Sequence, residues 1–133
     1  MSISIIILGY WNQKEGGMPT SEVLELFGKS PNNDLEGVLA HDEKTYCEYS
    51  ITQENNAATV ISIDRPYGHH SLYELLFELL KRGPYMLFSP EGRIVPVVAR
   101  SDMPEHLPEN VIEAFGIPVV VTDGASLSST LFG

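Results

Sequence analysis

Two adjacent histidines, His69 and His70, come nearest to catalytic chemistry in this sequence by type and spacing. They immediately precede an expected helix, and Asp64 and Arg65 lie a few residues earlier in the same loop. A histidine that is oriented by a carboxylate can act as a general base. One hypothesis is therefore a small enzyme or ligand-binding protein that uses these four residues. The alternative hypothesis is that the histidines are turn residues at the entry of the helix.

Other residues that often do chemistry lack the spacing that it needs. The single cysteine, Cys47, excludes a disulfide within the chain and a multi-cysteine metal site. Its mid-strand position favours a small core residue over a catalytic thiol, which needs a stabilised thiolate. Adjacent side chains usually diverge, which argues against a pair of metal ligands at His69 and His70, and His41 and His106 stand alone in the sequence. We therefore expect no bound metal and no cofactor. Because phosphate-binding glycine motifs and the nucleophile motif G-x-S-x-G are also absent, we expect that the protein is not an enzyme.

Charge is the most informative property of the chain. Eighteen acidic residues against eight basic ones give a formal net charge of −10. A nucleic-acid-binding protein needs a basic surface, which this composition does not provide, and an anionic membrane would repel the chain. A basic protein is the partner that such a charge favours. The alternative is that the acidity only keeps the protein soluble.

The acidic residues are concentrated in two parts of the chain. Residues 15–54 hold nine acids against two lysines, and residues 102–133 hold five acids and no base. We therefore predict an acidic face that binds a cationic protein, and Tyr10 and Trp11 are candidate aromatic anchors beside it. The alternative for these two aromatic residues is packing against the end of the sheet. The acidic face is predicted to contain Glu15, Glu22, Glu25, Asp42, Glu43, Glu48 and Glu54.

The element pattern predicts one domain over residues 1–133, since a chain of 133 residues is near the usual size of a single domain. Short polar breaks between the middle strands favour an antiparallel meander. The order β-α-β-β-β-α-β-β-α-β predicts an α+β fold with a mixed, mostly antiparallel sheet and about three helices. Strands are expected at residues 3–8, 35–41, 45–51, 58–63, 85–89, 93–99 and 117–122, and helices at 20–27, 71–82 and about 108–115.

Several local features refine this pattern. The expected helix at 71–82 is apolar around most of its circumference, so it belongs at the centre of the core or at a subunit contact. The second option leaves a homodimer or an oligomeric scaffold protein open. Ser71 and Glu74 match a capping box, and Thr20 or Ser21 is expected to cap the first helix. Pro96 should move its strand toward a sheet edge or a bulge, and the strand at 117–122 should be buried. Residues 123–133 read as a tail of small residues with Leu127, Leu131 and Phe132 at roughly helical spacing. Its start at 123–126 either opens a helix that binds an anion or forms a capped turn, and the lack of nearby bases favours the turn.

The N-terminal segment is apolar but short. No basic residue precedes the apolar run, and no small-residue cleavage site follows it, so we expect no signal peptide and a cytoplasmic protein. No uncharged apolar run approaches the roughly 18 residues that a membrane-spanning helix needs.

In overall character the chain resembles bacterial immunity proteins, which are small inhibitors of toxins delivered by contact-dependent inhibition or type VI secretion. The features that carry this resemblance are the acidic blocks 15–54 and 102–123 and the absence of a catalytic motif. No sequence motif matches, so no residue role is transferred. The resemblance implies a one-to-one complex that neutralises a cognate, basic and nuclease-like toxin domain.

Overall fold

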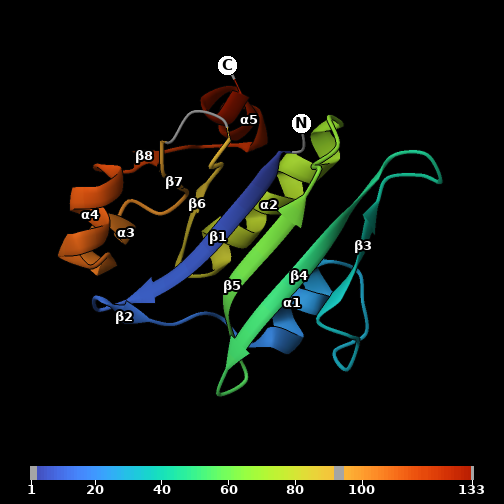
Figure 1. Ribbon diagram of the computed structural model, residues 1–133, viewed down its shortest axis with the longest axis horizontal. Helices are drawn as coiled ribbons and strands as arrows, with labels where there is room; N and C mark the ends of the chain where they lie inside the picture. Colours follow the sequence, from blue (N-terminus) through green and yellow to red (C-terminus); the bar gives the residue numbers. More distant parts are fainter. Residues whose placement is uncertain (1–2, 92–94, 133) are drawn as a thin grey trace.

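The computed structural model describes residues 3–91 and 95–132. Seven strands form one sheet in the order β3-β4-β5-β1-β6-β7-β8, and an eighth, the short β2, pairs with β1 (Figure 1). Neighbouring strands are antiparallel except β7 and β8, which are parallel. The strands are β1 (Ser4–Trp11), β2 (Lys14–Glu15), β3 (Glu36–Ala40), β4 (Tyr46–Glu54), β5 (Ala57–Asp64), β6 (Tyr85–Phe88), β7 (Val97–Val98) and β8 (Val119–Val120).

Among the described residues, five helices accompany the sheet, whereas the sequence predicts about three. They are α1 (Thr20–Leu26), α2 (His70–Arg82), α3 (Met103–His106), α4 (Glu109–Phe115) and α5 (Gly124–Phe132). The α+β fold with a mixed, mostly antiparallel sheet is thus confirmed, and the two additional helices are α3 and α5. Within the described residues, no helix combines the length and the apolar character that crossing a membrane requires.

Two tight turns set the register of the long hairpins. Asn55 and Asn56 join β4 to β5 with φ angles of 52° and 65°, and Asn12 and Gln13 join β1 to β2 with φ angles of 52° and 63°. Two consecutive residues with positive φ match the right-handed twist of the strands that they connect. The predicted meander of β3, β4 and β5 is therefore confirmed, whereas the hairpin of β1 and β2 lies in a segment expected to be a loop.

One face of the sheet carries the main core. Ile5 and Ile7 of β1 point to this face and are fully buried against α2, whose Leu72, Leu76 and Leu79 are also fully buried. In Figure 1, α1 and α2 lie behind the sheet, and α5 packs against α2. The helix that the sequence placed either in the core or at a subunit contact therefore lies at the centre of the core.

The opposite face of the sheet is covered over only part of its width. A second, smaller cluster joins Met86 and Phe88 of β6 to Met103, Leu107 and Val111 from the α3–α4 region. The alternate residues of β1 also pack against this cluster. No described helix covers the same face over β3, β4 and β5, which stand in front in Figure 1. We call this uncovered part, over β3, β4 and β5, the open face.

The C-terminal part differs most from expectation. The sequence predicts a buried strand at 117–122, but the observed strand β8 has only two residues. Ile117, Val119 and Val120 are 76%, 41% and 44% exposed, because β8 is the edge of the sheet. The expected tail is instead α5, which starts at a turn where Asp123 Oδ1 accepts a hydrogen bond from the Ser126 amide at 2.7 Å. The expected capped turn is therefore present.

Three further local predictions are corrected. Of the two options for Pro96, the sheet edge is wrong, because β7 lies between β6 and β8 and the Pro96 carbonyl accepts from the Val119 amide. The cap of α2 is His69 rather than a Ser71–Glu74 box, since His69 Nδ1 accepts from the Ser71 amide at 3.1 Å. The cap of α1 is the residue before Thr20, a proline without a side-chain hydrogen bond. The strand expected at 93–99 falls partly outside the described residues.

Candidate functional site

The open face presents a row of four residues that crosses four strands. The register pairs Val38 with Glu48, Glu48 with Asp64, and Asp64 with Ser4. Side chains alternate between the two faces of a strand, and the neighbouring Cys47 is buried in the main core. Glu48 therefore points to the open face, where Asp64 is its direct cross-strand partner.

A second row lies beside the first. Glu36 pairs with Ser50, and Ser50 pairs with Ser62. The two serines are small and half-buried, so they leave the neighbouring carboxylates prominent. Val38 is 40% exposed and Tyr46, at the start of β4, is 54% exposed. The open face thus combines carboxylates with two exposed apolar side chains.

The carboxylates of the open face lack a cationic partner in the described part of the chain. Among the acidic residues that the structure describes, only Glu78 and Asp102 form ion pairs. Asp64 accepts a hydrogen bond from Ser4 Oγ at 3.3 Å. Arg65 lines the same surface depression of about 490 Å³ as Glu48 and Asp64, but its guanidinium makes no ion pair within 4.0 Å with either carboxylate. A negative field therefore remains over this surface.

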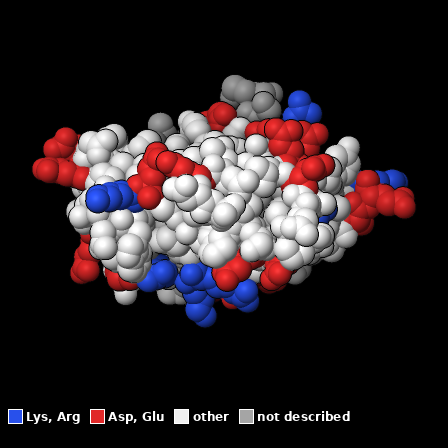
Figure 2. Space-filling model, turned by 90° about the horizontal axis from the view of Figure 1, so that it is seen from below, with Lys and Arg blue, Asp and Glu red and all other residues white. Residues whose placement is uncertain are grey.

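The structure spreads the seven predicted acidic residues over several surfaces. Glu48 lies on the open face, Asp42 and Glu43 lie in the turn between β3 and β4, and Glu22 and Glu25 lie on α1, behind the sheet. In Figure 2 the acidic side chains lie mainly around the rim of the view, its centre is uncharged, and basic side chains gather along the lower edge.

The two remaining predicted residues, Glu15 and Glu54, lie on β2 and at the end of β4. Two acidic residues of the open face, Glu36 and Asp64, were not among the seven.

A histidine cluster joins the turn after β3 to the start of α2. The rings of His41 and His69 stack with centroids 3.7 Å apart, and those of His69 and His70 lie 4.2 Å apart. Desolvation, followed by the nearby His41 and His70, lowers the pKa of His69 below its ordinary value. No hydrogen bond or ion pair links these rings to Asp64 or Arg65, the other two residues of the enzyme hypothesis.

The stacked rings also do not converge on a common point. Within residues 3–91 and 95–132, no group of three or more histidine, cysteine, aspartate or glutamate residues is placed to hold a metal ion. His69 uses Nδ1 to accept from the Ser71 amide, which caps α2. The arrangement is that of a contact between two segments of the fold.

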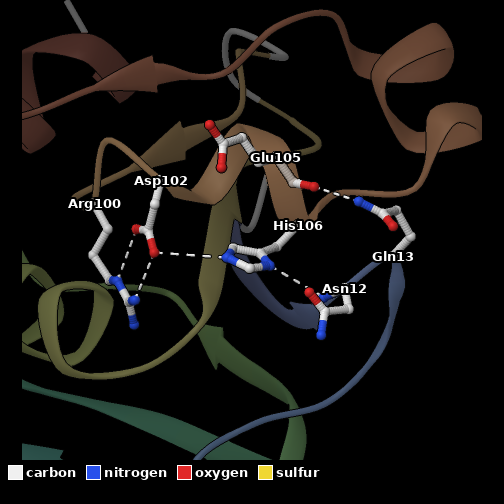
Figure 3. Close-up of polar contacts among 6 residues, drawn as sticks. All are labelled: Asn12, Gln13, Arg100, Asp102, Glu105 and His106. Carbon is white, nitrogen blue, oxygen red and sulfur yellow. Dashed lines mark hydrogen bonds and ion pairs between the residues drawn. The ribbon is translucent and has the colours of Figure 1, made fainter.

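His106 lies in a hydrogen-bonded cluster that the sequence did not indicate (Figure 3). Its Nδ1 accepts from the Asn12 amide at 3.1 Å, and its Nε2 lies 3.6 Å from Asp102 Oδ2. The Arg100 guanidinium holds Asp102 with contacts of 3.0 and 2.7 Å and lowers the pKa of that carboxyl. The Gln13 backbone amide donates to the His106 carbonyl, and its side-chain amide donates to the Glu105 carbonyl. The hydrogen bonds of this cluster hold the β1–β2 turn against α3.

The two candidate aromatic anchors have different surroundings. The Trp11 ring stacks on His106 with centroids 3.7 Å apart, while the Arg100 guanidinium lies 5.5 Å from the Trp11 ring centre. Trp11 remains 43% exposed. Tyr10 is half-buried and packs against the smaller core cluster, and this burial, with Glu15 nearby, raises its pKa. Packing therefore accounts for Tyr10, whereas Trp11 still presents a surface.

Cys47 is a core residue, as its position in the strand predicted. It is 2% exposed, and burial raises the pKa of its thiol to about 11. A thiol with that pKa is almost entirely protonated at neutral pH and is a poor nucleophile.

Comparisons of this chain with protein-family models, with curated proteins and with solved structures find no match.

Proposed function

We propose that this protein is an immunity-type inhibitor that binds and neutralises a cationic bacterial protein toxin, one to one. The observation that carries the proposal is the open face, where Glu36, Glu48 and Asp64 from three adjacent strands lie without an ion pair among the described residues. Burial of such carboxylates against lysine or arginine side chains of a partner would supply the missing charges.

The overall charge supports the same kind of partner. A net charge of −10 accelerates association with a cationic protein and disfavours nucleic acid and anionic membranes. A nuclease toxin fits this pattern because a surface that binds nucleic acid is itself basic. An inhibitor that covers this basic surface would block the substrate.

The placement of titratable side chains favours binding over catalysis. His106 Nδ1 accepts from the Asn12 amide, His69 caps a helix, and Cys47 is buried with a raised pKa. The scaffold alternative depended on the apolar helix α2 being free to contact another subunit. Because the sheet, α1 and α5 surround α2, that helix offers little surface to a second copy.

Co-expression tests the proposal directly. Genes for immunity proteins of this kind are expected beside a gene for a large secreted protein with a variable C-terminal domain. We would express that C-terminal domain in a bacterial host with and without this protein and follow growth. Restored growth together with a stable one-to-one complex is the expected result. A toxin that kills equally well in the presence of this protein would contradict the proposal.

A further inference from the structure

We infer that the open face, through Glu36, Glu48 and Asp64 with Val38 and Tyr46, is the surface on which the cationic protein partner docks. This inference rests on the proposed function and assigns the contact to one surface. The acidic residues of α1 and of the β3–β4 turn are not part of the central contact.

The first argument is the pairing of like charges across the sheet. Glu48 and Asp64 are direct partners on adjacent strands, and like charges in this position oppose folding. A lysine or threonine at either position would have removed the repulsion without changing the strand. A cationic side chain placed between the two carboxylates by a partner would relieve it in the complex.

The second argument is that several acidic residues elsewhere already have local partners. Asp42 Oδ1 accepts hydrogen bonds from the backbone amides of Lys44 and Thr45. These bonds lower the pKa of Asp42 and hold its carboxylate in the β3–β4 turn. Asp102 is paired with Arg100, and Glu78 with Arg82. Glu36, Glu48 and Asp64 form no ion pair among the described residues, although Arg65 lines the same depression as Glu48 and Asp64.

The third argument is the mixture of side chains on this surface. Tyr46 and Val38 flank the carboxylate row and are 54% and 40% exposed. Tyrosine is frequent among the residues that dominate binding energy at protein interfaces. Ser50 and Ser62 are too small to hold a partner away from the sheet. A second copy of this chain is disfavoured as the occupant, since two molecules of charge −10 repel each other.

The test uses a decalysine peptide as a defined cationic probe. The isotope-labelled protein is titrated with the peptide at low salt, and amide shifts are mapped by NMR. We expect the largest shifts in β3, β4 and β5. In the double variant Glu48→Gln, Asp64→Asn the apparent dissociation constant should rise about fivefold. The matched double variant Glu22→Gln, Glu25→Gln removes the same charge from α1 and should leave the constant nearly unchanged.

Three results would overturn the inference: no measurable binding, shifts centred on α1 or α4, or equal weakening by the two double variants. These results are separable from a failure of the proposed function. If the co-expressed toxin is neutralised but the peptide maps to another surface, the assigned surface is wrong and the function stands. If the peptide maps to the open face but no toxin is neutralised, the function is wrong and the cationic binding surface stands.

Discussion

Glu48 on β4 and Asp64 on β5 are direct cross-strand partners, and no basic side chain of the described residues forms an ion pair with either one. Two carboxylates in this arrangement reduce the stability of the isolated fold. They lie on the one part of the sheet that no described helix covers. The sheet therefore keeps an unfavourable pair where a partner can reach it.

Replacement of Glu48 by glutamine should stabilise the isolated protein. The change removes the like-charge pair and keeps the side-chain shape, so the free energy of unfolding should rise by about 0.2–1 kcal/mol. Urea unfolding at low salt measures this value. Glu36→Gln is the matched control, because the cross-strand partner of Glu36 is the uncharged Ser50. If Glu48→Gln lowers the stability or matches the control, Glu48 and Asp64 do not repel each other.

Truncation of Leu76 should cost far more than truncation of its neighbour Phe77. Leu76 is fully buried at the centre of α2, and Leu76→Ala should reduce stability by about 2–5 kcal/mol through the cavity that it leaves. Phe77 is only half-buried, so Phe77→Ala should cost less. Urea unfolding of both variants gives the comparison. A loss below about 0.5 kcal/mol for Leu76→Ala would show that α2 is not in the core.

The stability should decrease on mild acidification because of His69. Desolvation and the neighbouring His41 and His70 lower the pKa of His69 from its ordinary value of 6.5, and they outweigh the opposite effect of Asp42 and Glu74. The unfolded chain therefore takes up this proton at a higher pH than the folded chain does. The stability due to neutral His69 is present above about pH 6.5 and is lost as the pH falls through the lowered pKa.

Urea unfolding between about pH 5 and 8 checks this expectation. The informative variant is His69→Asn, because asparagine still caps a helix but does not titrate in this range. The variant should show a flatter dependence of stability on pH than the wild type. If the variant and the wild type show the same dependence of stability on pH, groups other than His69 cause that dependence.

The contact between Trp11 and His106 should be visible in fluorescence. Trp11 is the single tryptophan of the chain, so its emission reports one site. His106→Ala removes the stacked ring and the acceptor of the Asn12 amide. We expect emission at longer wavelength as the indole becomes more exposed to water. His41→Ala, far from this contact in sequence and stacked on His69 instead, should leave the emission unchanged. Equal spectra for both variants would contradict the contact.

The strand order of the meander was predictable because it depends on local signals. Short polar breaks between β-branched segments favour hairpins, and β3, β4 and β5 follow that pattern. The end of β5 was placed one residue early, at Ile63, which left Asp64 in a loop. The pairing of Asp64 with Glu48 was missed for that reason. Alternation with the buried Leu39 and Cys47 was the available signal for the outward direction of Glu36 and Glu48.

The segment that forms α5 has apolar residues at roughly helical spacing, but its many small residues favoured a tail over a helix. Their role is close packing: a Cβ added at Gly124 would lie 2.8 Å from the backbone nitrogen of Glu74 in α2. Glycine at this position lets the start of α5 approach α2. The cluster around His106 was not predictable, because it joins residues more than 90 positions apart in the sequence.

The most direct test of the central claim is the rate at which the neutralised toxin associates with this protein at several salt concentrations. Attraction between opposite fields should give a rate that falls as salt rises, since salt screens charges beyond about 10 Å at 0.1 M. Glu48→Gln with Asp64→Asn should slow association and flatten the salt dependence, whereas Glu22→Gln with Glu25→Gln should change both much less. An association rate that is indifferent to salt, or equal effects of the two double variants, would contradict docking of a cationic partner on the open face.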